Sequence, residues 1–198
     1  AIYLFDEDKL SFRAGETGDE CFSKGVNDYY QFEISDEVAA KGNIMSLLDR
    51  SCRKDAVPSH AFYSLFRDCK GLTEAPELPV TKLEERCYGS MFEGCTSLTK
   101  APALPATKLT GWCYDSMFKG CTSLTEAPKL PATELAEWCY WMMFYGCMGL
   151  TEAPDLPATN LANSCYLAMF LGCTSLTEAP DLPATVLANG CYAWMFYD

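Results

Sequence analysis

Two series of cysteines, each with an interval of 26 residues, constrain this chain more than any other feature of its sequence. One series is Cys87, Cys113, Cys139, Cys165 and Cys191, and the other is Cys69, Cys95, Cys121, Cys147 and Cys173. A strict period of this length is typical of a solenoid, in which each repeat forms one coil and buries its apolar side against its neighbours.

The repeat begins at residue 61 and has the pattern C-Y-x-x-M-F-x-G-C-T-S-L-T-x-A-P-x-L-P-A-T-x-L, followed by three free positions. It predicts a solenoid domain over 61–198, with units at 61–86, 87–112, 113–138, 139–164 and 165–190 and a partial unit at 191–198. The first unit departs from the pattern, with Ala61 in place of Cys and Leu65 in place of Met. An atypical terminal unit is expected of a capped stack.

Within each unit, C-Y-x-x-M-F-x-G-C has apolar residues at helical spacing and a glycine suited to a helix end, so it predicts a short helix. T-S-L-T-x-A-P predicts a short parallel strand that ends at proline, which has no N–H to donate. Because helices need about 8 to 10 Å and stacked strands about 4.8 Å, the predicted α/β stack is curved, with its strands on the concave side.

Residues 1–60 do not repeat, and we expect them to form a small N-terminal β cap. IYLF and YYQFEIS resemble strands, and GNIMSLLD at 42–49 is the expected junction with the solenoid. The chain opens at Ala1 rather than Met, so we expect a processed product that has lost any export signal. It stops at Asp198 within a unit, and either a removed continuation or a partner would cover that end.

The segments LTEAPDLPAT and MFKGCTSL, with a leucine two residues after each PAT, resemble the BspA-like bacterial leucine-rich repeats. The resemblance covers about two thirds of the chain and implies an exported protein at the bacterial cell surface or outside the cell. Characterised members of that family are described as adhesins or binding proteins, so it also implies a binding function. The 26-residue period and the Ala-Pro dipeptides depart from the commonest leucine-rich pattern.

Composition excludes several functions. A net charge of −12 disfavours nucleic acid and anionic membrane surfaces, both of which attract clustered Lys and Arg. No apolar run reaches the roughly 20 residues of a membrane-spanning helix. The sequence lacks the familiar hydrolase and phosphate-binding motifs, and His60 is its only histidine. We therefore expect neither an enzyme nor a cofactor.

The cysteine spacing argues against zinc and against disulfides within a unit. Neither C-x2-C nor a Cys and His set occurs, and the two cysteines of a unit lie eight residues apart, roughly 12 Å along a helix. Disulfide geometry requires Cα atoms within about 7 Å. We expect two ladders of buried thiols, while Cys21 and Cys52 outside the ladders could pair with each other.

The repeats differ from one another at a defined set of positions. Relative to the first Cys of each unit, positions −4, 0, +1, +4, +5 and +8 are nearly constant and predict the core side of a helix. Positions −1, +2, +3 and +6 vary and predict an outward face. In the later units these positions carry the candidate contact residues Trp112, Trp138, Trp141, Met142, Tyr145, Leu167, Leu171, Trp194 and Tyr197.

An exposed stripe of this composition is typical of a binding surface, because Trp and Tyr are enriched at binding hot spots. The alternative is cover by the same protein, either another segment or a second copy. The secondary candidates lie on the predicted concave face, where a threonine ladder is joined in the late units by Glu152, Asp155, Glu178 and Asp181. Those carboxylates would suit a basic partner or a cation.

Together these patterns predict a non-enzymatic binding or adhesion module that recognises a protein or a glycan. The alternative function is a structural spacer or self-associating scaffold domain within a larger surface protein.

Overall fold

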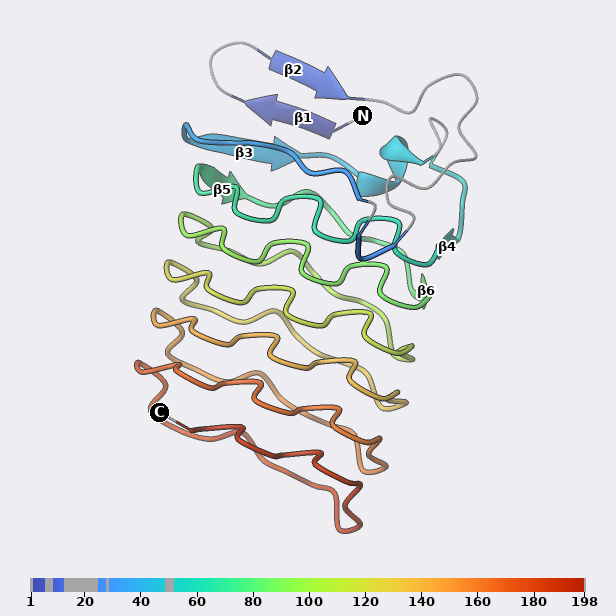
Figure 1. The fold of residues 1–198 in the computed structure, drawn as a ribbon, viewed down its shortest axis with the longest axis vertical. Helices are drawn as coiled ribbons and strands as arrows, with labels where there is room; N and C mark the ends of the chain where they lie inside the picture. Colours follow the sequence, from blue (N-terminus) through green and yellow to red (C-terminus); the bar gives the residue numbers. More distant parts are fainter. Residues whose placement is uncertain (1, 6–8, 13–24, 28, 49–51, 198) are drawn as a thin grey trace.

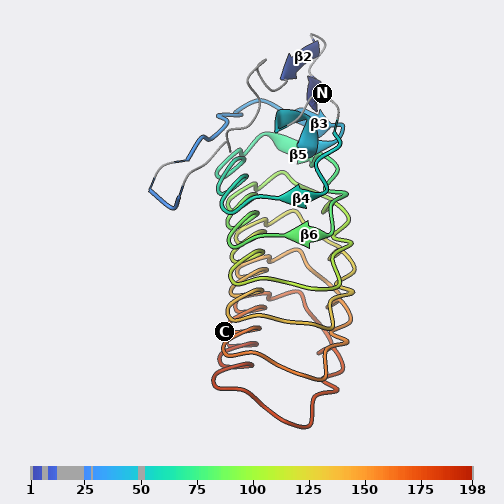
Figure 2. The ribbon, with the colours of Figure 1, turned by 90° about the vertical axis from the view of Figure 1, so that its right-hand side faces the viewer.

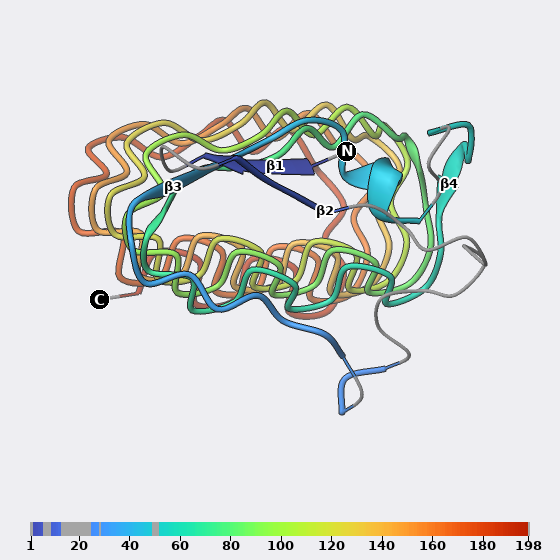
Figure 3. The same ribbon diagram turned by 90° about the horizontal axis from the view of Figure 1, so that it is seen from above.

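The computed structural model describes residues 2–5, 9–12, 25–27, 29–48 and 52–197, and it is a stack of 26-residue coils. The chain descends through the stack in sequence order, from the N-terminal strands to the last coil (Figures 1 and 2). Each coil is a flattened loop with two long sides (Figure 3). The predicted repeat solenoid is therefore present. We number the coils 58–83, 84–109, 110–135, 136–161 and 162–187, followed by a final half coil, 188–197.

One long side of each coil is a run of overlapping turns where the sequence predicted a helix. The described residues contain no α-helix, and C-Y-x-x-M-F-x-G is turn in every full coil up to the final cysteine of the motif. We call this side the turn layer; it consists of residues 58–69, 84–95, 110–121, 136–147, 162–173 and 188–197. The prediction of a short helix in each coil was wrong.

Backbone N–H groups in the turn layer alternate between two kinds of partner. In coil 1 the N–H groups of Ala61, Tyr63 and Leu65 donate to the carbonyl three residues earlier and close successive turns. The intervening N–H groups, such as those of Phe62 and Ser64, donate to the next coil. This alternation repeats in every coil, and the N···O distances between coils are 2.7 to 3.3 Å.

The alternation requires a left-handed residue at every fourth position. In coil 4 these residues are Trp138, Met142 and Gly146, with φ of 60°, 52° and 69°. The constant apolar residues at positions 0, +4 and +8 fit a period of four residues as well as they fit the 3.6 residues per turn of an α-helix. Glycine at position +7 adopts the left-handed conformation without strain. A residue with a side chain at either of the other two left-handed positions has a conformational free energy about 1–2 kcal/mol higher. The hydrogen bonds between coils hold these residues in place.

The opposite side, which we call the proline face, has fewer bonds between coils. It consists of residues 72–83, 98–109, 124–135, 150–161 and 176–187. Coil 1 contains the short strands β5 (Leu72–Glu74) and β6 (Lys82–Leu83). In later coils the described pairing is limited to isolated parallel bridges such as Glu126 to Glu152. The predicted strand is thus reduced to single bridges, as expected where prolines remove donors.

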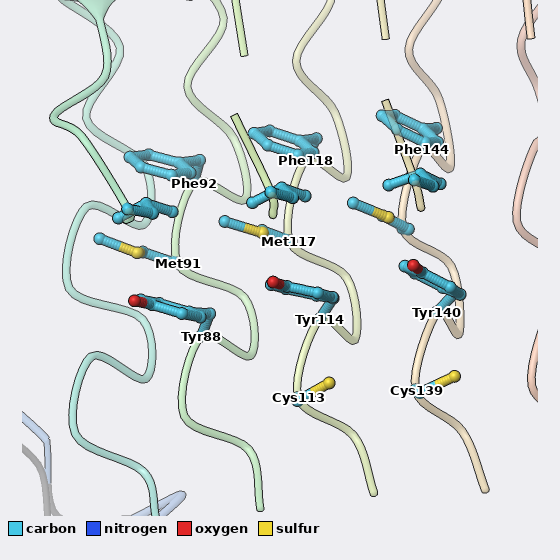
Figure 4. Packing of buried hydrophobic residues seen from close by; sticks show 14 of the residues in the cluster. Tyr88, Met91, Phe92, Cys113, Tyr114, Met117, Phe118, Cys139, Tyr140 and Phe144 are labelled. Atoms are coloured by element: carbon cyan, nitrogen blue, oxygen red, sulfur yellow. The ribbon is translucent and has the colours of Figure 1, made fainter. Parts of the chain in front are cut away.

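The core between the two sides is built from columns of identical residues. Stacked Tyr and Phe rings run along the molecule with centroids 5.6 to 6.0 Å apart, and methionines lie between the two rows (Figure 4). Both cysteine series are free and buried, as predicted. In the second series the thiol of Cys121 donates to the Phe92 carbonyl one coil earlier, at 3.1 Å. Burial raises the pKa of Cys113 to about 12, so its thiol is protonated at neutral pH.

The N-terminal segment continues the stack beyond coil 1. Strands β1 (Ile2–Phe5) and β2 (Lys9–Phe12) are antiparallel, and β3 (Val38–Lys41) joins β1 to β5 in the order β2-β1-β3-β5. β4 (Ala56–Val57) pairs with β6 in parallel. The 3₁₀ helix η1 (Ile44–Leu47) is buried at the expected junction. IYLF forms β1 as predicted, whereas YYQFEIS is not a strand in its described residues. The Cys21–Cys52 pair lies outside the described residues because Cys21 is not among them.

The stack has no pronounced curvature (Figure 2). The predicted bend depended on helices that would separate the coils more widely on one side. Turns joined by backbone hydrogen bonds replace those helices, so the cause of the bend is absent. The acidic residues expected on a concave surface therefore lie on the nearly straight proline face.

The backbone conformation of the turn layer can be tested with two glycine substitutions. Gly146→Ala should lower the free energy of unfolding by about 1–2 kcal/mol, because φ of 69° disfavours a side chain. In Gly111→Ala the new Cβ would meet only the Glu137 carbonyl oxygen, at an ordinary 3.6 Å. That control should leave stability unchanged or raise it slightly. Urea denaturation measures both, and equal effects would contradict the assigned conformations.

Candidate functional site

The predicted contact residues lie on the outer surface of the turn layer, which we call the outer face. Trp112, Trp138, Trp141, Met142, Tyr145, Leu167 and Leu171 are partly exposed, and Trp194 and Tyr197 are exposed. Coils place equivalent positions above one another, so these residues form columns that run along the stack.

Three tryptophans form the centre of the outer face. Trp112 and Trp138 stack with parallel rings and centroids 6.4 Å apart, and Trp141 meets Trp138 edge to face at 5.5 Å. The Arg86 guanidinium lies 4.5 Å from the centroid of the Trp112 ring and extends the same column. These contacts between neighbouring rings restrict the arrangement of the three tryptophans.

The neighbouring column changes from charged to apolar along the stack. Glu93 forms ion pairs with Arg67, at 3.5 Å, and with Lys119, at 3.0 Å. Lys119 also lies 5.6 Å from the centroid of the Tyr145 ring. Leu171 and Tyr197 continue this column in the later coils. The first half of the outer face is therefore polar, and the second half is aromatic and aliphatic.

Position +3 departs from the prediction of an outward face. Four of the five full coils carry a buried residue there, namely Ser64, Ser90, Ser116 and Ala168, and Met142 of coil 4 is partly exposed. These are left-handed residues, so their side chains do not follow the directions of a helical wheel. The prediction of an outward face is therefore wrong at position +3 in those four coils.

Asp115 lies at position +2, which was predicted to face outward, but its carboxylate is buried, so the prediction is wrong at this residue. Its exposed fraction is 4%, and its Oδ1 atom has no hydrogen-bond partner among the described residues. Gly89 makes room for it, since a Cβ on that glycine would lie 2.4 Å from Oδ1. Burial raises the pKa of Asp115 to about 7, an increase opposed by Arg86 and supported by Glu93. Gly89, one coil earlier in the same column, was the available sequence signal.

The secondary candidates lie on the proline face, where Glu152, Asp155, Glu178 and Asp181 are all exposed. Thr151, Glu152, Thr177 and Glu178 line a shallow depression of about 320 Å³. Among the described residues, no group of three or more His, Cys, Asp or Glu side chains is placed to hold a metal ion.

A larger groove, of about 620 Å³, lies near the start of the proline face and was not predicted. Residues 74–79 of coil 1 and residues 99–103 and 105 of coil 2 line it, with prolines and alanines between Glu74 and Lys100. The same feature recurs more weakly between the next coils. Proline creates these grooves because it keeps neighbouring backbones from closing into a continuous sheet.

Asp115 should make stability depend on pH. Its folded-state pKa is raised, so the folded protein holds a proton that the unfolded chain releases, and stability falls as pH rises from about 4 to about 7. Between pH 5 and pH 8 the free energy of unfolding of the wild type should fall by up to about 3 kcal/mol, and Asp115→Asn should not show this fall. Urea denaturation across this range measures it. Asp155→Asn, at an exposed site, is the control. If the stability of Asp115→Asn depends on pH in the same way as that of the wild type, Asp115 is not the residue responsible.

In the described part of the chain, no helix is long and apolar enough to span a lipid bilayer. Comparison with known proteins gave no matching family model and no significant similarity to a curated protein or a solved structure.

Proposed function

We propose that this chain is a non-enzymatic binding module of the BspA-like repeat type, which recognises a protein or a glycan through its outer face. The contiguous aromatic surface built around Trp112, Trp138 and Trp141 carries the proposal. The repeat motif supports the BspA-like assignment, although the turn layer departs from the helix that the resemblance implies. An exported location, at the bacterial surface or outside the cell, is part of the same proposal.

The arrangement of the rings favours recognition. Partly exposed Trp and Tyr side chains supply large apolar contacts, and rings already fixed by stacking lose little conformational freedom when a ligand binds. Planar aromatic surfaces also suit the apolar faces of sugar rings. Lys119 and Glu93, beside Tyr145, provide polar groups at the border of the aromatic area.

A second candidate function is a structural spacer that associates with copies of itself. It is favoured by the contiguous aromatic surface around Trp112, Trp138 and Trp141, because a large exposed apolar surface is also typical of a face that associates with another copy. In that function the aromatic surface would be covered by another copy rather than by a foreign ligand.

The proposal predicts that Trp138→Ser/Trp141→Ser/Tyr145→Ser lowers affinity at least 10-fold for any ligand found on an array of defined glycans and purified extracellular proteins. The protein should remain folded with a moderately lower melting temperature, because these rings are only partly buried. The matched control replaces Glu152, Asp155, Glu178 and Asp181 with their amides and should retain binding.

Two outcomes would contradict the proposal. If only the amide variant lost binding, the binding site would lie on the proline face instead of the outer face. If the wild type binds nothing on the array and the serine variant changes only the sedimentation coefficient, the spacer function is supported instead.

A further inference from the structure

Two ionisable side chains of the outer face, Asp115 and Arg86, have no part in the proposed function. Arg86 and Gly89 close one turn of coil 2 through a backbone hydrogen bond, and Trp112 and Asp115 close the equivalent turn of coil 3. Because the second turn follows the first in the stack, Arg86 lies over the Trp112 ring and Asp115 extends toward Gly89. The carboxyl and the guanidinium are therefore held on neighbouring columns of two successive coils.

The Asp115 carboxyl is closed off from water on one side. A Cβ built on Gly89 would lie 2.4 Å from Asp115 Oδ1 and 3.1 Å from Tyr63 Cδ2. The carboxyl of coil 3 and the ring of coil 1 thus meet over the glycine of coil 2. Oδ1 is buried there and has no hydrogen-bond partner among the described residues. A neutral carboxyl tolerates this environment, whereas a carboxylate would lack donors in place of its lost water.

Arg86 has a different partner in the structure. Its guanidinium stacks on Trp112, 4.5 Å from the ring centroid, and its Nε lies 3.9 Å from the exposed Glu85 carboxylate. In the part of the chain that the structure describes, Arg86 forms no ion pair with Asp115, although its charge acts on that carboxyl. A cation–π contact at a partly exposed site is weaker than a charge-assisted hydrogen bond to a carboxylate. Arg86 therefore gains from a change of partner once Asp115 is ionised.

Glu93 is the carboxylate whose charge raises the pKa of Asp115. Its side chain forms ion pairs with Arg67, at 3.5 Å, and with Lys119, at 3.0 Å. The cations on this side of Asp115 are thus already paired with Glu93, so an ionised Asp115 would turn to Arg86.

The remaining ionisable neighbours keep their charge near neutral pH. Burial raises the pKa values of Tyr63 and Cys113, so both groups are protonated and uncharged. His60 faces Arg86, and burial and the Arg86 charge lower its pKa against the opposing effect of Glu85, so it is neutral at pH 7. Burial raises the pKa of Asp115 to about 7. Of this group, Asp115 is the one that changes charge near neutrality.

We propose that Asp115 and Arg86 form a pH-sensitive switch that covers or uncovers the Trp112 ring. While Asp115 is protonated, Arg86 stays on the ring. When Asp115 releases its proton to solvent, Arg86 leaves the ring and forms an ion pair with the carboxylate. One face of Trp112 is then uncovered, and the other stays stacked against Trp138. The consequence for recognition rests on the proposed function: a ligand that stacks on Trp112 would bind more tightly above neutral pH than below it.

The experiment follows Arg86 and Asp115 by NMR in the isotope-labelled protein, without a ligand, between about pH 5 and about pH 8. The ring current of Trp112 shifts protons that lie over its face upfield. The Arg86 δ-protons should therefore be shifted upfield at low pH and lose this shift as pH rises. The Asp115 carboxyl carbon, measured in the same samples, should titrate with the same midpoint.

Three variants assign the change to its cause. In Asp115→Asn the Arg86 δ-protons should stay upfield throughout the range, because no carboxylate forms. In Trp112→Leu the upfield shift should be absent at every pH, which shows that it reports contact with the ring. His60→Asn, which removes the other group that titrates near this range, should behave as the wild type. If Asp115→Asn does not fold, the wild-type titration still decides, because both resonances must share one midpoint.

Three results would overturn the proposal. One is an Arg86 shift that stays constant while Asp115 titrates, including the case in which only the indole N–H of Trp141 responds, since Trp141 Nε1 is a buried donor without an acceptor among the described residues. Another is an Asp115 carboxyl that titrates at its ordinary value near pH 4. The third is a pH-dependent Arg86 shift that persists in Asp115→Asn.

These measurements use no ligand, so the switch and the proposed function can fail separately. If Arg86 keeps one position at every pH, the switch is wrong and recognition through the outer face is unaffected. If the wild type binds nothing on the array but Arg86 moves with Asp115, the proposed function is contradicted and the switch is supported.

Discussion

The structure depends on how the turn layer divides its backbone N–H groups between two partners. Half of them close turns within a coil, and the other half reach the next coil. A single coil therefore leaves half of these donors unsatisfied, and only stacking supplies their acceptors. The columns of buried Tyr, Phe and Met residues have the same requirement, because each ring is covered by its neighbours above and below (Figure 4). Backbone and side chains thus favour the same register of 26 residues.

The sequence was sufficient to predict the repeat, its 26-residue period and most of its core. Tyr114, Phe118 and Met117 are buried as the constant positions predicted, and so are the thiols. It did not distinguish a helix from a run of turns, because apolar residues four apart suit both structures. The decisive signal was weak: Gly120 and its equivalents mark one left-handed position in each coil, but Ser116 and Trp112 occupy the others.

The candidate site was predicted in part. The partial exposure of Trp138, Trp141 and Tyr145 agrees with the predicted outer face, because variable positions are those free of the core in either backbone conformation. Ser90 and Ser116 were wrongly predicted to face outward because the orientation of their position was taken from helix geometry. Asp115 was missed because its burial depends on a glycine 26 residues earlier, a relation that appears only when the coils are aligned. The backbone hydrogen bonds that join each coil to the next could not be predicted, since the expected helices would not make them.

The central claim is most directly tested by scalar couplings across hydrogen bonds in the isotope-labelled protein. The Phe118 amide nitrogen should couple to the carbonyl carbon of Met143, 25 residues later, because its N–H donates to that carbonyl at 2.9 Å. An α-helix would instead connect it to the carbonyl of Tyr114, four residues earlier. The first coupling supports the turn layer and its direction, and the second would contradict both.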